Sequence, residues 1–197
     1  IPYKEKVIPY LDFIDDTAKA VGAVNTVVNH DGKLYGYNTD VNGFIALIQK
    51  SEMVFEGKKV LVLGSGGTSK TAAYVSKMLG CASVFRVSRN RREDCISYED
   101  ATRYHNDSEV IINTTPCGMF PDIGRSAIDI GSFSQLECVI DVVYNPIRTK
   151  LVTDARKRGI NATGGLYMLV AQAAYAAEKF IGKKADTKKI YDIYNSL

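Results

Sequence analysis

Short apolar runs alternate with longer segments of helical periodicity through most of the chain. Four runs predict buried strands: KKVLVLG (58–64), ASVFRVS (82–88), EVIINTTP (109–116) and CVIDVVYNP (138–146), the last two ended by their prolines. Four segments predict helices: TAAYVSKMLG (71–80), TKLVTDARKRG (149–159), GGLYMLVAQAAYAAEKFIG (164–182) and TKKIYDIYNSL (187–197). Near-continuous apolar strands alternating with helices are typical of a parallel sheet covered on both faces. The pattern therefore predicts an α/β fold with a Rossmann-type, doubly wound parallel sheet.

The first part of the chain has a different pattern. Two alternating runs flank Asn29-His30-Asp31-Gly32, and alternation around Asp-Gly is a strong signal for a β-hairpin. Residues 9–21 predict a short helix or a turn-rich connection, and residues 41–51 predict a helix. The polar stretch 89–108 predicts short helical turns.

Composition limits the function classes. The 197 residues are 46% hydrophobic and 24% charged, which suits one or two globular domains, and the net charge of +3 is too small to argue for a nucleic-acid partner. No apolar run approaches the ~20 residues that span a bilayer, so we expect no membrane partner. The four scattered cysteines form no CxxC pair and predict reduced thiols in a cytoplasmic protein. His30 and His105 predict solvated turn residues, and no metal site is expected.

The segment VLVLGSGGTSK (60–70) is the most informative motif. A buried strand ends in the glycine-rich turn Gly64–Thr68, and a helix-forming run follows from Thr71. In such a turn the backbone N–H groups and the helix N-terminus face an anion such as a pyrophosphate. Ser69 replaces the third glycine of the usual fingerprint, where a small residue is enough for close packing. A plain tight turn is the alternative; the strand–turn–helix context favours a dinucleotide site at Gly64, Ser65, Gly66, Gly67 and Thr68.

The end of the second strand of this unit indicates which dinucleotide is bound. NAD-binding proteins usually place an Asp or Glu there for the ribose 2′-OH. This chain instead has Ser88-Arg89-Asn90-Arg91-Arg92, with three guanidinium groups that match phosphate oxygens. The segment predicts NADP. A solvated basic loop is the alternative, and Glu93 or Asp94 stays open as a late ribose carboxylate.

Several residues outside this unit are candidates for the chemistry. Lys4 and Asp40 are the candidate acid–base pair, although a lysine in KEK is usually solvated and an aspartate before a helix is usually an N-cap. Asn25 lies in the hairpin, where polar residues often face solvent. Gln172 is a polar residue on an apolar helix, and Gly165 precedes that helix where a cap or a close backbone approach is expected.

Taken together, these segments resemble the shikimate dehydrogenase family. The resemblance rests on IPYKEKVIPYLD, GAVNTVV, YGYNTD followed by Asn42-Gly43, LGSGGTSK, INTTPCGM, IDVVYNP and GGLYMLVAQA, which occur in family order over essentially the whole chain. It implies two α/β domains with a cleft between them. Residues 1–40 would be the remnant of a substrate-binding domain, 41–164 the NADP-binding Rossmann domain, and 165–197 helices that return to the substrate domain.

The resemblance also implies an activity: reversible NADP-dependent reduction of 3-dehydroshikimate to shikimate, in aromatic amino-acid biosynthesis. By position, Lys4 matches the catalytic lysine and Asp40 its partner, both also touching substrate. The other matched substrate contacts are Asn25, Tyr144 and Gln172, and Val142 and Gly165 match positions near the nicotinamide. Ser88 to Glu93 align with a motif that usually begins Asn-Arg-Thr, so Arg89 is kept while both its neighbours differ.

Two alternatives stay open. One is a quinate/shikimate dehydrogenase with relaxed substrate or cofactor choice, and the other is a truncated NADP-binding module without turnover. The second arises because the chain begins IPYKEKV without the family's early serine-containing loop, so we expect that an N-terminal part of the substrate domain is absent. The expected partner is a small-molecule substrate, and the protein would be a monomer or homodimer.

Overall fold

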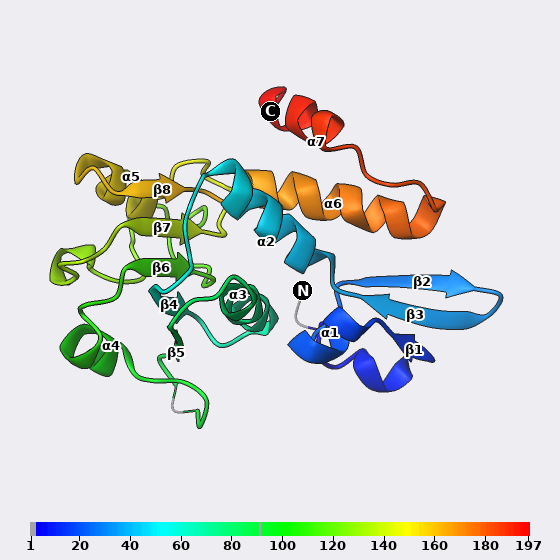
Figure 1. Ribbon diagram of the computed structural model, residues 1–197, viewed down its shortest axis with the longest axis horizontal. Coiled ribbons are helices and arrows are strands. Elements are labelled where there is room, and N and C mark those ends of the chain that lie inside the picture. The colour runs from blue at the N-terminus through cyan, green and yellow to red at the C-terminus, as the bar shows by residue number, and fades with distance from the viewer. Residues whose placement is uncertain (1–2, 91) are drawn as a thin grey trace. The chain divides into compact units, whose positions relative to one another are not determined.

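The computed structural model describes residues 3–90 and 92–197, and the chain divides into two compact units. The first unit contains Ile1–Leu47 and Tyr167–Leu197, and the second unit contains Ile48–Leu166. Figure 1 shows their elements in chain order. The assignment of 1–40, 41–164 and 165–197 to substrate-binding, nucleotide-binding and returning segments stays a prediction.

The second unit is built on a five-stranded parallel sheet. Its strands are β4 (Lys59–Leu63), β5 (Ser83–Val87), β6 (Val110–Asn113), β7 (Cys138–Asp141) and β8 (Asn161–Thr163). They lie in the order β5-β4-β6-β7-β8, so the chain goes to one side of β4 first and then returns to its other side. In such a sheet the carboxyl end of the first strand is the place where ligands bind. The glycine turn follows β4 and therefore lies at this point.

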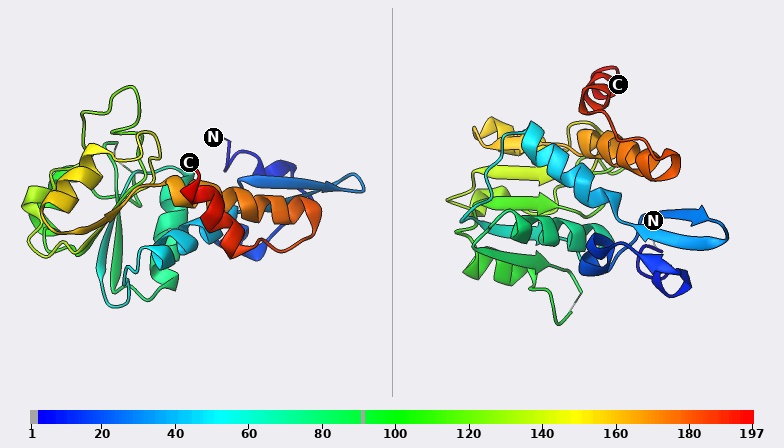
Figure 2. Two further views of the ribbon diagram at one scale, coloured as in Figure 1. Left: turned by 90° about the horizontal axis from the view of Figure 1, so that it is seen from above. Right: turned by 45° about the vertical axis from the view of Figure 1, so that its right-hand side comes forward.

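Helices cover both faces of this sheet. Figure 2 shows α3 (Gly67–Met78) on one face, and α4 (Tyr98–Tyr104) and α5 (Lys150–Lys157) on the other. Because side chains alternate along a strand, Leu61, Ile111 and Val139 share one face and pack with buried residues of α4 and α5 in one apolar cluster. A short 3-10 helix, η2 (Ile130–Ser132), adds to that cluster. The predicted doubly wound α/β fold is confirmed.

Some element boundaries differ from the predictions. β6 and β7 end at Asn113 and Asp141, well before Pro116 and Pro146. Each terminal side chain accepts a hydrogen bond from the N–H two residues on, at 3.0 Å from Thr115 and 3.1 Å from Val143, and so turns the chain out of the sheet. α3 begins at Gly67, four residues before Thr71. β8 was not predicted, because three residues of mixed polarity give no strand pattern.

The polar stretch 89–108 contains the two-turn helix α4. Ser97 Oγ accepts from the N–H of Asp100 at 3.0 Å, and the Asp100 carboxylate accepts in return from the N–H of Ser97 at 3.4 Å. This reciprocal cap stabilises a helix too short to form alone. His105 follows it, and its ring lies 4.1 Å from the ring of Phe85. The prediction of a solvated turn histidine is wrong for His105, because the Nδ1 atom of its ring is buried. This burial also holds the pKa of the imidazole below its usual value.

The first unit contains a small mixed sheet. Its strands are β1 (Phe13–Ile14), β2 (Thr26–His30) and β3 (Lys33–Tyr37), in the order β1-β3-β2. β2 and β3 form the predicted hairpin, with Asp31 (φ 52°) and Gly32 (φ 83°) in the left-handed region that a two-residue turn requires. A 3-10 helix, η1 (Ile8–Tyr10), and α1 (Asp16–Val21) lie before the hairpin.

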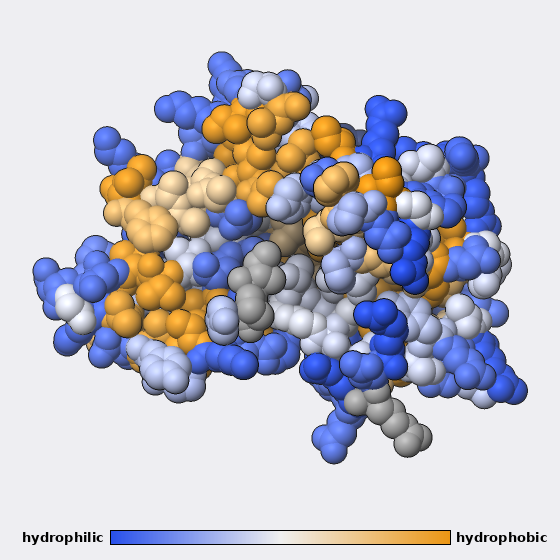
Figure 3. Space-filling model, turned by 180° about the vertical axis from the view of Figure 1, so that it is seen from behind, coloured by the Kyte–Doolittle hydropathy of each residue, from blue (hydrophilic) through white to orange (hydrophobic). Residues whose placement is uncertain are grey.

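Three further helices contribute to the first unit: α2 (Thr39–Lys50), α6 (Leu166–Ile181) and α7 (Thr187–Asn195). α2 and α6 touch closely at Gly43, where an added Cβ would lie 2.8 Å from Gln172 Cβ and 2.9 Å from Met168 O. α7 meets α6 through the rings of Tyr167 and Tyr194, 5.2 Å apart. The exposed large apolar side chains of this unit include Tyr10, Phe13, Phe180, Ile181 and Leu197. Figure 3 shows several apolar patches on the face of the protein that it draws. Among the described residues, no helix is long and apolar enough to cross a membrane.

Candidate functional site

Lys4 and Asp40 form an ion pair in the first unit. Lys4 Nζ donates to Asp40 Oδ2 at 2.5 Å, and the two side chains are 20% and 9% exposed. Lys4 is therefore a partly buried cation and not a solvated surface charge. The carboxylate of Asp40, in the first turn of α2, binds side chains from other segments.

Asn25 completes this arrangement. Its Nδ2 donates to Asp40 Oδ1 at 2.9 Å and to Thr39 Oγ1 at 3.1 Å, while its Oδ1 accepts from the N–H of Thr39 at 2.8 Å. The backbone holds the segments together, because Val24 N–H donates to Lys4 O at 2.8 Å. Each oxygen of the Asp40 carboxylate thus has a donor, and Lys4, Asn25 and Asp40 lie together.

The Lys4 and Asn25 side chains line an open pocket of about 300 Å³ in the first unit. The other lining residues are Tyr3, Val7, Val24 and Val27. One ammonium and one amide beside apolar walls suit a small molecule that carries hydroxyl groups on an apolar frame.

The other predicted substrate contacts are Gln172 and Tyr144. Gln172 is half-buried in α6, where Nε2 donates to Leu169 O at 3.0 Å and the backbone is close to Gly43. Tyr144 belongs to the second unit and is 46% exposed, in the loop after β7. Their contact with a substrate stays a prediction.

The glycine turn has the features that a phosphate site requires. Gly64 has φ +121°, and a Cβ there would lie 2.5 Å from Thr114 Oγ1. A Cβ at Gly66 would meet nothing within 4 Å, so the space before α3 is open. Gly66 is the N-cap of α3, and no described side chain caps that end. Its first-turn N–H groups, with Gly67 and Thr68 as the first helical residues, fit an anion approaching the backbone.

The basic segment after β5 lies beside this turn. Ser88 is buried, and its Oγ donates to Ser65 Oγ at 3.4 Å and accepts from the N–H of Asn90 at 3.2 Å. Arg89, Asn90 and Arg92 are exposed, whereas Arg91 lies outside the described residues. Of these, Arg89 lines a pocket of about 540 Å³ together with Tyr98, Thr115 and Pro116.

Arg86 is a site residue that sequence reasoning missed. It lies in β5, where its Nη2 donates to Ser65 O at 3.0 Å and its Nε to Ser69 Oγ at 3.2 Å. Its Nη1 pairs with the Asp94 carboxylate. The available signal was a single arginine inside the apolar run SVFRV, since a charge in a buried strand needs a partner.

Val142 and Gly165 meet through their backbones. A Cβ on Gly165 would lie only 2.1 Å from Val142 O, and Gly165 N–H donates to Val143 O at 3.0 Å. Asp141, just before this contact, is fully buried, and burial raises the pKa of its carboxyl to about 6. Hydrogen bonds from Thr149 (2.7 Å), Asn113 (2.9 Å) and the N–H of Val143 (3.1 Å) act against that rise.

Metal-binding residue types are not gathered in the described parts of the chain. Over 3–90 and 92–197, no three His, Cys, Asp or Glu side chains are placed to hold a metal ion.

Comparison with known proteins gives the family. Residues 1–27 match the model of the shikimate dehydrogenase substrate-binding domain. The NADP(+)-named shikimate dehydrogenase of Clostridium perfringens is 37% identical over 206 aligned positions, which include all of this chain and 76% of that protein. The chain belongs to the shikimate dehydrogenase family.

Solved shikimate dehydrogenases have the same fold. Shikimate dehydrogenase 1 of Peptoclostridium difficile superimposes with a TM-score of 0.91 at 34% identity, covering 100% of this chain and 75% of that one. The Thermus thermophilus enzyme, solved in complex with NADP(H) and shikimate, superimposes with a TM-score of 0.85 at 27% identity, covering 100% and 76%. This member of the shikimate dehydrogenase family thus spans about three quarters of these relatives, and both Lys4 and Asn25 fall in the segment that matches the family's substrate-binding model.

Proposed function

We propose that the protein catalyses the reversible, NADP-dependent reduction of 3-dehydroshikimate to shikimate, a step of aromatic amino-acid biosynthesis. Family membership supports this activity, and the Lys4–Asp40 pair carries it. We assign Lys4, Asn25, Asp40, Tyr144 and Gln172 to the substrate.

Lys4 handles the proton at the substrate C3 oxygen. Its ammonium donates one hydrogen bond to Asp40 and has two further N–H donors, one of which can be given to a substrate oxygen. In the reduction, negative charge grows on that oxygen as C3 gains a hydride, and the Lys4 ammonium within hydrogen-bond reach stabilises this charge and donates a proton to the oxygen. In the reverse oxidation, the neutral Lys4 amine takes the proton back from the hydroxyl. Asp40 fixes the position of Nζ, and Asn25 fixes the carboxylate through its other oxygen.

The residues of the second unit fit a dinucleotide. The open space at Gly66 and the uncapped start of α3 fit the pyrophosphate, and the close contact between Gly165 and Val142 fits a flat ring laid on backbone. We therefore assign Gly64–Thr68 to the pyrophosphate and Val142 and Gly165 to the nicotinamide end. When bound, NADP supplies the hydride chemistry, so no metal is required.

The segment from Ser88 to Arg92 supports NADP over NAD. Arg89 and Arg92 are exposed cations in the segment that follows β5, the strand end where NAD-binding proteins use a carboxylate. Asp94, an open candidate for that carboxylate, is already paired with Arg86.

A cytoplasmic location is part of the proposal, for a protein that is a monomer or homodimer. Cys81, Cys95, Cys117 and Cys138 are all free thiols, which supports a reducing compartment.

The experiment is a matrix of four assays on the intact protein: shikimate or quinate as substrate, each with NADP or NAD. The expected result is fastest formation of NADPH with shikimate. Faster turnover of quinate than of shikimate would instead support a quinate/shikimate dehydrogenase with relaxed substrate choice. Binding of NADP without turnover of either substrate would contradict the enzyme and leave a nucleotide-binding module.

A further inference from the structure

An ion pair that the proposed chemistry does not use lies beside the glycine turn. Arg86 is the cation, and its side chain is only 12% exposed. It contacts Ser65 O and Ser69 Oγ, so it is fixed against both the turn and the first helical turn of α3. A partly buried guanidinium with this many acceptors is held in one orientation.

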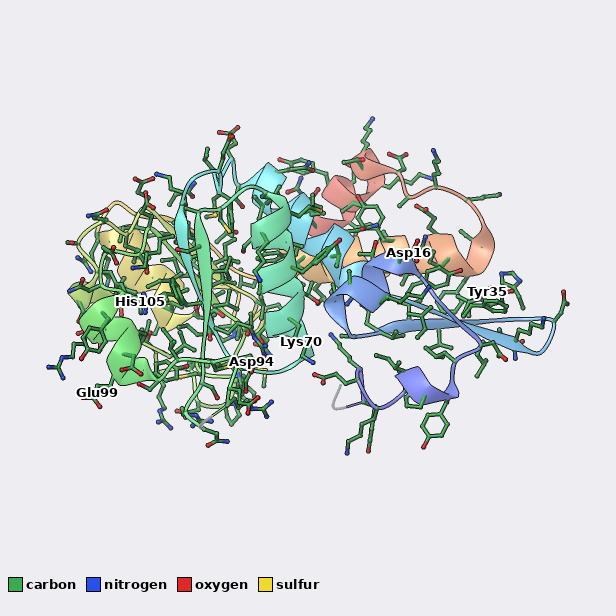
Figure 4. The ribbon with its side chains drawn as sticks, turned by 60° about the horizontal axis from the view of Figure 1, so that its bottom comes forward. Asp16, Tyr35, Lys70, Asp94, Glu99 and His105 are labelled. Carbon is green, nitrogen blue, oxygen red and sulfur yellow. The ribbon has the colours of Figure 1, made fainter. Side chains whose placement is uncertain are left out.

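Asp94 is the anion of the pair, and both of its carboxylate oxygens are engaged. Oδ2 pairs with Arg86 Nη1, and Oδ1 accepts from Cys95 Sγ at 3.6 Å. Burial acts to raise the pKa of the Asp94 carboxyl, but the Arg86 charge and the surrounding hydrogen bonds hold it below its usual value. Asp94 is therefore an anion at neutral pH, directed toward Arg86. Figure 4 shows Asp94 at the same edge of the second unit as Lys70, near the start of α3.

The pair lies at the ribose end of the nucleotide site. Arg86 lies in β5 and Ser88 directly after it, two residues apart in sequence. Both contact Ser65, Arg86 through the backbone oxygen and Ser88 through the hydroxyl. Position 88 directly follows β5, at the strand end where dinucleotide-binding proteins read the ribose 2′ position. Asp94 is thus an acidic side chain close to where a ribose carboxylate would act.

We propose that Arg86 is a specificity-determining residue, which favours NADP by keeping the Asp94 carboxylate in an ion pair. Although the Asp94 side chain is 60% exposed, its Oδ2 is held by Arg86, and the Arg86 charge offsets the negative charge of Asp94 beside the 2′-phosphate. The inference rests on the proposed NADP-linked activity and deepens it. It adds to the exposed arginines a residue that suppresses NAD recognition.

The test uses three variants of the intact protein: Arg86→Met, Asp94→Asn and the double variant. The dissociation constants of NADP and NAD are measured for each, and the readout is their ratio, because loss of general structural support would weaken both dinucleotides alike. Arg86→Met should lower the preference for NADP about tenfold, and Asp94→Asn should raise it about threefold, for single charges acting at partly screened distances. The double variant should regain at least half of the loss on a logarithmic scale.

Matched controls and contrary outcomes separate the two proposals. Asp107→Asn breaks another ion pair of the second unit, with Lys59, and should leave the ratio unchanged. If Arg86→Met weakens both dinucleotides equally, or Asp94→Asn leaves the ratio within twofold or lowers it, the inference is overturned while the proposed function stands. If the unaltered protein binds neither dinucleotide, the proposed function fails and the inference fails with it.

Discussion

The two candidate sites are built in different ways. In the second unit, the dinucleotide would bind to backbone atoms of one continuous turn. Gly64, Gly66 and Gly67 are suited to this turn because they have no side chain that would block the approach to the backbone. In the first unit, the working atoms belong to side chains brought together over 36 residues, from Lys4 to Asp40, and over 15 from Asn25 to Asp40. The first kind of site is sensitive to added atoms, and the second to lost charge.

Loss of charge in the first unit should have the larger effect. Asp40→Asn keeps the shape of the side chain and an oxygen for Asn25, but removes the anion that fixes Lys4. We expect kcat to fall about 100- to 1,000-fold, as for disturbed acid–base groups, with the dissociation constant of NADP unchanged. Steady-state kinetics and equilibrium binding measure the two. Asp31→Asn in the hairpin turn is the control, and an equal loss there would contradict the prediction.

Added atoms in the second unit should separate stability from binding. Gly64→Ala places a Cβ at φ +121° and 2.5 Å from Thr114 Oγ1, so it should lower the free energy of unfolding by about 2–4 kcal/mol. Gly66→Ala meets nothing within 4 Å and should leave stability within about 0.5 kcal/mol while weakening NADP about tenfold or more. Urea unfolding and dinucleotide titration test the pair. NADP binding unaffected by Gly66→Ala would place the pyrophosphate elsewhere.

Asp141 adds a pH dependence to the stability of the second unit. Its carboxyl has a pKa raised by burial from 3.8 to about 6, so the folded state binds one more proton than the unfolded state between these values. The contribution of this group to the free energy of unfolding is full below pH 3.8 and is lost as pH rises through about 6. This contribution is about 3 kcal/mol, because the pKa rises from 3.8 to about 6 and each pKa unit corresponds to about 1.36 kcal/mol.

Asp141→Asn should remove this loss. Urea unfolding of the unaltered protein and of the variant between pH 3.8 and about 6 gives the free energy of unfolding at each pH. We expect the slope of this free energy against pH to be more positive in the variant than in the unaltered protein. An offset between the two curves is expected, because an amide cannot reproduce the hydrogen bonds from Thr149, Asn113 and Val143. Parallel curves would contradict the raised pKa.

The smallest expected effect concerns the choice of dinucleotide. Arg89→Ala removes one exposed guanidinium and should weaken NADP about tenfold while changing NAD less than about twofold. Titration with both dinucleotides measures this, and Arg103→Ala, on α4, is a control for general loss of positive charge. If Arg89→Ala weakens the binding of NADP and of NAD equally, Arg89 does not contact the 2′-phosphate.

These differences also explain what the sequence alone could predict. The βαβ unit and its glycine turn depend on residues that are close together in the sequence. The apolar runs and the glycines therefore predicted their positions, although α3 begins earlier than expected. The hairpin at Asp31-Gly32 was equally local. Lys4 and Asp40 were singled out by resemblance to a family, since nothing in the spacing of two residues so far apart indicates contact. Arg86 was missed because its partners come from two other segments, Ser65 and Ser69 from the glycine turn and the start of α3, and Asp94 from the loop after β5.

We assign proton transfer to Lys4 in the first unit and dinucleotide binding to the second unit. The most direct test measures kcat with shikimate and the dissociation constant of NADP on one preparation of Lys4→Ala, beside Lys6→Ala as the exposed control two residues away. We predict that kcat falls about 1,000-fold or more in Lys4→Ala alone, with NADP affinity within about twofold of the unaltered protein in both variants. Unchanged turnover in Lys4→Ala, or a parallel loss of NADP affinity, would contradict it.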